Sequence, residues 1–222
     1  MRLALVRRDL ASRPAMVLAP LAALMFSALA SLLLFGVLGK PAGLALYALL
    51  LEPFLSWYNF SEVLLKMIPL LLIAQGLAIG YRANVFNIGA EGQLILGAVA
   101  ASALPVAFPQ GGSVWMLPAM LLLGALGGMG WAAIAAALRA RFNANEILVT
   151  LMLNLIGFQV LTYLLLGPWK DPKGFNFPQT VRFPPDAMLP TLIGGTRVSV
   201  ALLIALAFSL LCHLLMRYGF LG

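Results

Sequence analysis

Apolar residues of this chain come in six long runs, separated by short breaks that hold polar residues, proline or glycine. A helix of about 20 apolar residues is long enough to cross the hydrocarbon layer of a membrane. We therefore predict six membrane-spanning helices, at residues 15–38, 61–81, 94–108, 114–138, 146–166 and 198–216. The apolar segment 40–60 is interrupted by Glu52 and Pro53. Because it ends near Trp57 and Tyr58, side chains typical of the membrane–water boundary, we expect it to lie at the interface.

The same pattern predicts an all-α fold, a polytopic transmembrane helical bundle that forms one domain over residues 1–222. We divide it into a first span (14–39), the interfacial segment (40–60), a core of four spans (61–166), an outer loop (167–197) and a sixth span (198–217). Composition agrees, because 63% of the residues are hydrophobic and only 9% are charged, unlike soluble domains. The first apolar run exceeds the hydrophobic region of a signal peptide, so we expect it to be retained.

The positions of lysine and arginine predict how the chain is oriented. With the N-terminus inside, eight arginines face the cytoplasm, namely Arg2, Arg7, Arg8, Arg13, Arg82, Arg139, Arg141 and Arg217. Five basic residues then face outward, namely Lys40, Lys170, Lys173, Arg182 and Arg197. Because cytoplasmic flanks carry the excess of positive charge, we predict a cytoplasmic N-terminus. These flanks account for the net charge of +7, and we expect no nucleic-acid partner.

The outer loop 167–197 differs from the other connections. Its six prolines exclude a regular helix and favour extended segments and turns. Two interpretations remain open: a solvated connector, or a docking surface for a partner on the outer side.

Catalytic and metal-binding patterns are missing from the sequence. One cysteine, Cys212, and one histidine, His213, provide neither a disulfide framework nor a metal cluster. The sequence contains no GxxxxGK[ST] phosphate loop, no HExxH and no GxSxG elbow. We therefore predict no catalytic residue, no metal and no cofactor in this chain, and a protein that is not an enzyme.

A first set of polar residues lies between the second and third predicted spans, in segment 82–93. A polar group at membrane depth needs a partner or a wet cavity, so such residues point to function. Asn84, Asn87 and Glu91 would share one face of a helix at their spacing of i, i+3 and i+7. Gly89 and Gly92 within the segment fit either a break in the helix or a close helix contact.

A second set begins the fifth predicted span. Glu146, Thr150 and Asn154 follow at i, i+4 and i+8, again on one helical face, and Asn145 precedes them. We predict that a substrate path is lined by both sets, namely Asn84, Asn87, Glu91, Gln93, Asn145, Glu146, Thr150 and Asn154. Hydrogen bonding between helices is the alternative for Thr150 and Asn154. Gly124 and Gly128 form a GxxxG pair, which predicts close helix packing.

These residues carry a resemblance to a known family. The segment VFNIGAEGQ (85–93), preceded by AIGYRA (78–83), resembles the signature of ABC-importer permeases of the nucleoside and simple-sugar branch. That branch is related to the ribose and branched-chain amino-acid permeases. NEI (145–147), TLMLN (150–154) and PQT (178–180) match the same family in order. The resemblance covers about residues 60–200.

The resemblance implies a permease subunit of the bacterial inner membrane that forms the path for a nucleoside or a simple sugar. It implies a cytoplasmic ABC ATPase that binds ATP, a second permease subunit in a homo- or heterodimer, and an extracytoplasmic substrate-binding lipoprotein. We also expect the outer faces of the spanning helices to contact membrane lipid.

Two further expectations follow from the comparison with that family. Its members have more spans and a cytoplasmic coupling loop, so we expect this chain to be the N-terminal part of a longer permease. An ion-coupled secondary transporter is the alternative, since it too would use intramembrane carboxylates and broken helices. A membrane enzyme lacks a credible set of catalytic residues here, and a purely structural subunit stays open.

Overall fold

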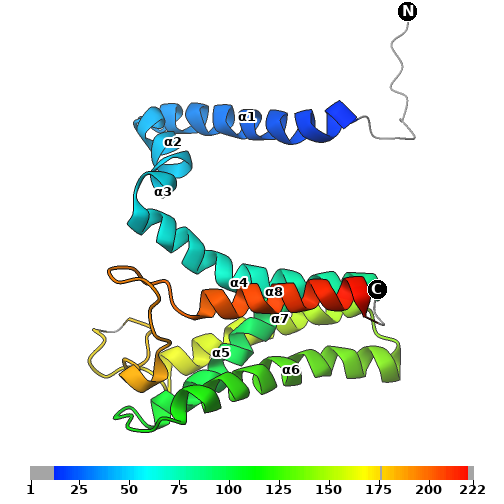
Figure 1. Cartoon of the computed structure of the whole chain (residues 1–222), viewed down its shortest axis with the longest axis vertical. Coiled ribbons are helices and arrows are strands. Elements are labelled where there is room, and N and C mark those ends of the chain that lie inside the picture. Colours follow the sequence, from blue (N-terminus) through cyan, green and yellow to red (C-terminus); the bar gives the residue numbers. More distant parts are fainter. Residues whose placement is uncertain (1–12, 176, 220–222) are drawn as a thin grey trace, which may run out of the picture. The chain divides into compact units, whose positions relative to one another are not determined.

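A computed structural model describes residues 13–175 and 177–219. Arg2, Arg7 and Arg8, which we predicted on the cytoplasmic flank, lie outside the described residues. In the described part the helices are α1 (Arg13–Val37), α2 (Ala42–Leu50), α3 (Glu52–Leu55), α4 (Trp57–Arg82), α5 (Ala90–Ala107), α6 (Met116–Phe142), α7 (Glu146–Leu166), the 3-10 helix η1 (Pro185–Ala187) and α8 (Ala201–Tyr218) (Figure 1). Six of them, α1 and α4 to α8, are long and apolar enough to cross a membrane. The predicted all-α fold with six spans is confirmed; the N-terminus-inside orientation stays a prediction.

Two helices begin four residues earlier than hydropathy predicted. α5 begins at Ala90 rather than at residue 94, because a polar first turn precedes its apolar part. α4 begins at Trp57, so the aromatic residues that we assigned to the interfacial segment belong to the first turn of a spanning helix. The extended backbone of Ser56 separates α4 from α3. Pro69 lies inside α4, about three turns after its start.

The chain divides into two compact units, Met1–Val63 and Leu64–Gly222. In the first unit α2 packs against α1 and α3, and no side chain described in α1 is buried. The second unit holds most of α4 and all of α5 to α8, and the polar residues of interest lie there.

Helix α5 is the central helix of the second unit and contacts both α6 and α7. Its contact with α6 runs through glycine. A Cβ built on Gly97 would lie 2.9 Å from the carbonyl oxygen of Gly124, and one built on Gly128 would lie 3.2 Å from that of Gln93. Small residues allow helix backbones to approach this closely. The GxxxG pair of α6 therefore lies against α5.

Part of the proline-rich loop folds back onto the helix ends. Ala187 of η1 joins Met116 and Met120 of α6 in a buried apolar cluster. The Asp186 carboxylate accepts a 2.6 Å hydrogen bond from the Gly112 backbone N–H in the connection between α5 and α6. This part of the loop is a cover on the helices rather than a free connector.

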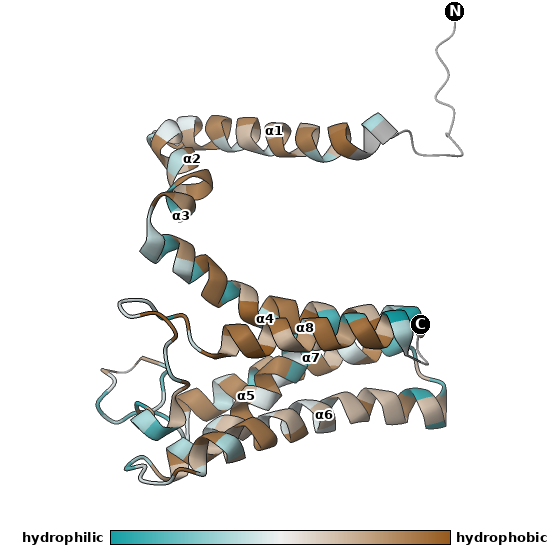
Figure 2. Cartoon of the chain, in the orientation of Figure 1, coloured by the Kyte–Doolittle hydropathy of each residue, from teal (hydrophilic) through white to brown (hydrophobic). Residues whose placement is uncertain are grey.

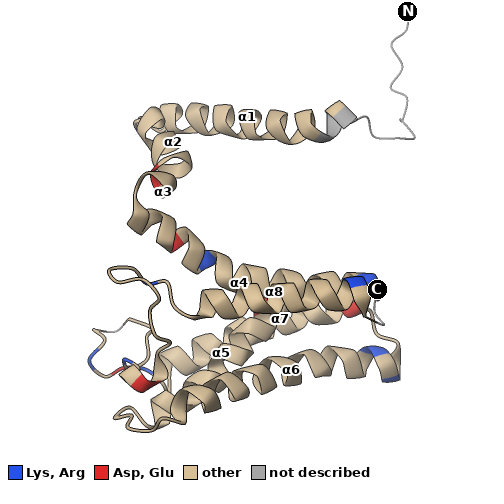
Figure 3. Cartoon of the chain, viewed as in Figure 1, with Lys and Arg blue, Asp and Glu red and all other residues tan. Residues whose placement is uncertain are grey.

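Charged residues of the second unit lie mostly at helix ends and in loops, which leaves the middle of most helices without charge (Figure 3), and most residues there are hydrophobic (Figure 2). Lys66 of α4 is the exception. One end carries the arginines of the last turns of α4, α6 and α8, namely Arg82, Arg139, Arg141 and Arg217. There Arg82 donates a 2.9 Å hydrogen bond to the Met216 carbonyl, which ties α4 to α8.

Candidate functional site

The polar segment that joins α4 to α5 begins with a helix-ending turn. Asn84 has a left-handed backbone, with φ of 56°. Its N–H donates to the Tyr81 carbonyl at 3.2 Å, and the Val85 N–H donates to the Gly80 carbonyl at 2.9 Å. These two bonds form a Schellman motif, in which asparagine is one of the residues that tolerate the left-handed position. Asn84 therefore ends α4, and its side chain is exposed.

The predicted helical face of Asn84, Asn87 and Glu91 does not form. The backbone leaves the helix after Arg82 and re-enters it at Ala90, so only Glu91 of the three is helical. The prediction of a shared face was wrong because the left-handed turn interrupts the helical spacing.

Asn87 ties this connection to the first turn of α5. Its Oδ1 accepts a 2.9 Å hydrogen bond from the Gly89 N–H, and its Nδ2 donates to Oε1 of Gln93 at 3.1 Å. Both side chains are partly buried. The two amides therefore form a pair with fixed orientation: Asn87 donates and Gln93 accepts.

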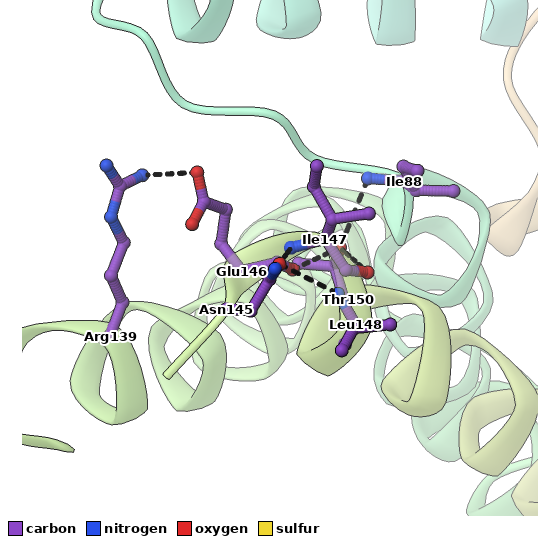
Figure 4. A network of polar contacts seen from close by, with 7 residues as sticks. All are labelled: Ile88, Arg139, Asn145, Glu146, Ile147, Leu148 and Thr150. Carbon is purple, nitrogen blue, oxygen red and sulfur yellow. Dashed lines mark hydrogen bonds and ion pairs between the residues drawn. The ribbon is translucent and has the colours of Figure 1, made fainter. Parts of the chain in front are cut away.

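The start of α7 lies opposite the α4–α5 connection and contributes further polar residues. Asn145 is the N-cap of this helix, since its Oδ1 accepts from the N–H groups of Ile147 at 2.9 Å and Leu148 at 3.4 Å. Glu146 forms a 3.0 Å ion pair with Arg139 of α6 (Figure 4). Their side chains are 20% and 39% exposed, respectively, so water screens the pair only in part.

Thr150 joins the two elements. Its side chain is buried, donates to the Glu146 carbonyl at 2.7 Å and accepts from the Ile88 N–H at 3.1 Å (Figure 4). A backbone N–H of the α4–α5 connection thus finds its acceptor on α7.

Two glycines of the segment allow α5 to approach α7. A Cβ on Gly89 would lie 2.5 Å from the Thr150 carbonyl oxygen, and one on Gly92 would lie 2.8 Å from the Cα of Asn154. Beside them, Asn154 Nδ2 donates to Oε2 of the exposed Glu91 at a long 3.4 Å. Of the two roles left open for Gly92, the structure shows close contact, not a helix break.

Two cavities flank the amide pair. The larger, of about 480 Å³, lies among α4, α5 and α6, and its lining is apolar except for Asn87 and Gln93. The smaller, of about 230 Å³, is bounded by the α4–α5 connection, α6 and α7. Its polar lining consists of Asn87, Gln93, Arg139, Glu146 and Thr150.

The eight predicted path residues therefore separate into three groups. Four of them line the smaller cavity, namely Asn87, Gln93, Glu146 and Thr150. Glu91 and Asn154 pair with each other and line neither cavity. Asn84 and Asn145 occupy helix ends, where their backbone or side chain completes the turn.

Sequence reasoning missed the role of Arg139, which was counted only as a cytoplasmic charge. A signal was present: a basic last turn, a three-residue connection and an acidic first turn place opposite charges side by side. Among the described residues, no group of three or more histidine, cysteine, aspartate or glutamate side chains could hold a metal ion.

Residues 59–222 match the family described as "Branched-chain amino acid transport system / permease component". A glucose ABC transporter permease protein of Haloferax volcanii is 41% identical over 145 residues, 64% of this chain and 37% of that protein. A guanosine ABC transporter permease protein of Bacillus subtilis is 32% identical over 154 residues, 69% of this chain and 44% of that protein. No solved structure matches the chain.

A nucleoside ABC transporter permease protein of Lactococcus lactis is 28% identical over 149 residues, 67% of this chain and 41% of that protein. The chain thus spans about two fifths of the length of these relatives, between 37% and 44%. The family and the six apolar helices identify a multi-pass protein of the bacterial inner membrane. The chain belongs to the permease-component family of branched-chain amino acid transport systems and, within it, to the ABC permeases of the nucleoside and simple-sugar branch.

Proposed function

We propose that this chain is part of the permease subunit of an ATP-binding-cassette importer and forms the translocation path for a nucleoside or a simple sugar. The observation that carries the proposal is the family match, which extends over residues 59–222. The relatives named for their solutes transport glucose, guanosine or nucleosides. All three solutes are uncharged and rich in hydroxyl groups.

The chemistry of the two cavities fits such solutes. An amide offers both a donor and an acceptor, so Asn87 and Gln93 can exchange hydrogen bonds with a hydroxyl group, whereas the Thr150 hydroxyl already donates to the Glu146 carbonyl and can only accept from a solute. The two charges in the smaller cavity, on Arg139 and Glu146, neutralise each other as an ion pair. We propose that Asn87, Gln93 and Thr150 line the path and that Asn84 and Asn145 act as helix caps.

Energy would come from outside this chain. We propose a cytoplasmic ABC ATPase as the subunit that binds ATP, a second permease subunit that completes the pore, and an extracytoplasmic substrate-binding lipoprotein that delivers the solute. The family supports an ATPase and a binding protein in general terms. A homodimer and a heterodimer fit equally.

Uptake into proteoliposomes tests the proposal. The permease, reconstituted with its ATPase and binding protein, should accumulate radiolabelled guanosine or glucose only when ATP is supplied to the ATPase. Accumulation driven by a proton or sodium gradient without ATP would instead support a secondary transporter. Unlabelled nucleosides and unlabelled hexoses are then added separately, and the class that reduces uptake of the radiolabelled solute is the transported class.

A further inference from the structure

The two cavities follow one another along α6. The larger touches Gly124, Gly128 and Ala132, whereas the smaller touches Ala132, Ala136 and Arg139. With a rise of 1.5 Å per residue, the stretch 124–139 covers roughly 22 Å, most of the ~30 Å hydrocarbon layer. Together the cavities thus follow a stretch of α6 about as long as most of that layer is thick, and they meet at Ala132.

The amide pair lies at that meeting point. Asn87, Gln93 and Ala132 line both cavities, and among these three Asn87 and Gln93 bring the polar side chains. Their 3.1 Å hydrogen bond therefore spans the boundary between the larger and the smaller cavity. The Arg139–Glu146 ion pair lines only the smaller cavity and cannot separate the two.

We propose that the Asn87–Gln93 hydrogen bond is a gate between the two cavities, an inference that rests on the proposed transport function. Asn87 is the fixed half, because its Oδ1 is also bonded to the Gly89 N–H. Gln93 is the movable half, because its longer side chain extends from the rigid helix α5. Rotation of Gln93 breaks one hydrogen bond between neutral groups and moves no charge.

A hydroxylated solute suits this gate. Once the pair opens, each amide presents a donor and an acceptor, which a sugar or ribose hydroxyl can engage in place of the lost bond. The solute would thus compensate for opening the gate, whereas an apolar molecule of equal size would leave both amides unpaired.

Thiol labelling from either side of the membrane tests the gate. Cys212 is the one cysteine and is buried, so a Cys212→Ala background is suitable. Single probes are then placed in the larger cavity (Leu72→Cys) and in the smaller one (Ala136→Cys). A membrane-impermeant methanethiosulfonate reagent is applied to right-side-out and inside-out vesicles without ATP. We expect each probe to react from one side only, and from opposite sides.

Removing the pair should abolish that asymmetry. Gln93→Ala and Asn87→Ala should each raise the labelling rate from the closed side roughly tenfold, about the equilibrium worth of one hydrogen bond. The double variant should show no further increase, because either substitution alone already breaks the bond. Gln75→Ala is the matched control: this amide of α4 is partly buried and lines neither cavity. It should leave the asymmetry unchanged.

Two results would overturn the gate: wild-type probes that both react from both sides, or an unchanged asymmetry in Gln93→Ala protein present in the membrane at wild-type amounts. Additive effects in the double variant would also count against a pair. A lack of ATP-driven uptake would argue against the proposed function alone, because the labelling needs neither ATP nor solute.

Discussion

Replacing Gly92 with alanine should force α5 and α7 apart, because the added methyl group has no room. A Cβ at this position would lie 2.8 Å from the Cα of Asn154 and 3.1 Å from its Oδ1. Carbon atoms in contact are at least about 3.5 Å apart, so the two helices must separate by roughly 0.7 Å here. The obstacle is a backbone atom, and no change of rotamer relieves it.

The expected loss of stability follows from two opposing terms. Inserting a methyl group into a packed contact costs about 1–3 kcal/mol. Alanine regains up to about 1 kcal/mol over glycine from its helix propensity, and less in the first turn, where Gly92 lies. With a gain of about 0.5 kcal/mol in the first turn, the net destabilisation of Gly92→Ala is roughly 0.5–2.5 kcal/mol, a factor of about 2–70 in the folding equilibrium.

Glycines of the neighbouring helix α6 provide a graded set of comparisons for Gly92 of α5. At Gly127 a Cβ would lie 2.5 Å from the Ala100 Cβ, so Gly127→Ala should destabilise as Gly92→Ala does. At Gly124 the nearest atoms are 3.4 Å away, an ordinary contact, and at Gly130 nothing lies within 4 Å. Gly124→Ala and Gly130→Ala should therefore leave stability unchanged or raise it by up to about 1 kcal/mol.

Unfolding of the purified permease by SDS in mixed micelles, followed by tryptophan fluorescence, measures these differences. Gly92→Ala and Gly127→Ala should unfold at a lower SDS fraction than the wild type, and Gly130→Ala should not. The close α5–α7 contact would be refuted if Gly92→Ala unfolded with the wild type. Equal damage from Gly130→Ala would show that helix position, not contact, sets the effect.

Three further substitutions separate structural from transport roles, using the same unfolding assay. Thr150→Val should destabilise by about 1–3 kcal/mol because the Ile88 N–H loses its acceptor, whereas Thr150→Ser should not; equal stability of both variants would contradict this. Asn145→Ala should cost about 0.5–2 kcal/mol through loss of the N-cap, whereas Asn145→Ser should keep both stability and uptake; loss of uptake alone in Asn145→Ser would instead place this residue in the path. Glu146→Gln should cost less than about 1 kcal/mol, because both partners of the ion pair are partly exposed to water, and the difference should shrink in 1 M NaCl, where the Debye length is about 3 Å; a larger, salt-independent cost would contradict this.

Hydropathy predicted the spanning helices well because an apolar run of membrane length leaves a helix as its main solution. It failed at the start of α5, since Glu91 and Gln93 make a first turn that reads as a connection. It failed again at Trp57, where aromatic side chains fit both an interface and the end of a span.

The roles of individual asparagines could not be read from the sequence. An asparagine in a path and one that ends a helix are both isolated polar residues beside an apolar run. Only the backbone separates them: Asn84 has a left-handed φ of 56°, and Asn145 accepts hydrogen bonds from the next turn of α7. A helix boundary uncertain by a few residues hides this difference.

Helical spacing did predict which residues of α7 lie together. Thr150 contacts the α4–α5 connection through Ile88, and Asn154 contacts the first turn of α5 through Glu91. Their partners lie 62 and 63 residues away in the sequence, and no local pattern identifies a contact at that separation. Residue spacing identifies which side chains share a face of a helix, but not which residues of other segments pack against that face.

The segment 85–93 combines two roles that its sequence alone presented as one. Gly89 and Gly92 hold α5 against α7, where a side chain would collide with backbone. Asn87 and Gln93 line the two cavities beside α6. The two roles depend on each other, because the amide of Asn87 meets that of Gln93 only while the glycines keep α5 in place. A substitution at Gly92 should therefore weaken the gate as well as the fold, whereas a substitution at Gln93 should open the gate and leave the fold intact.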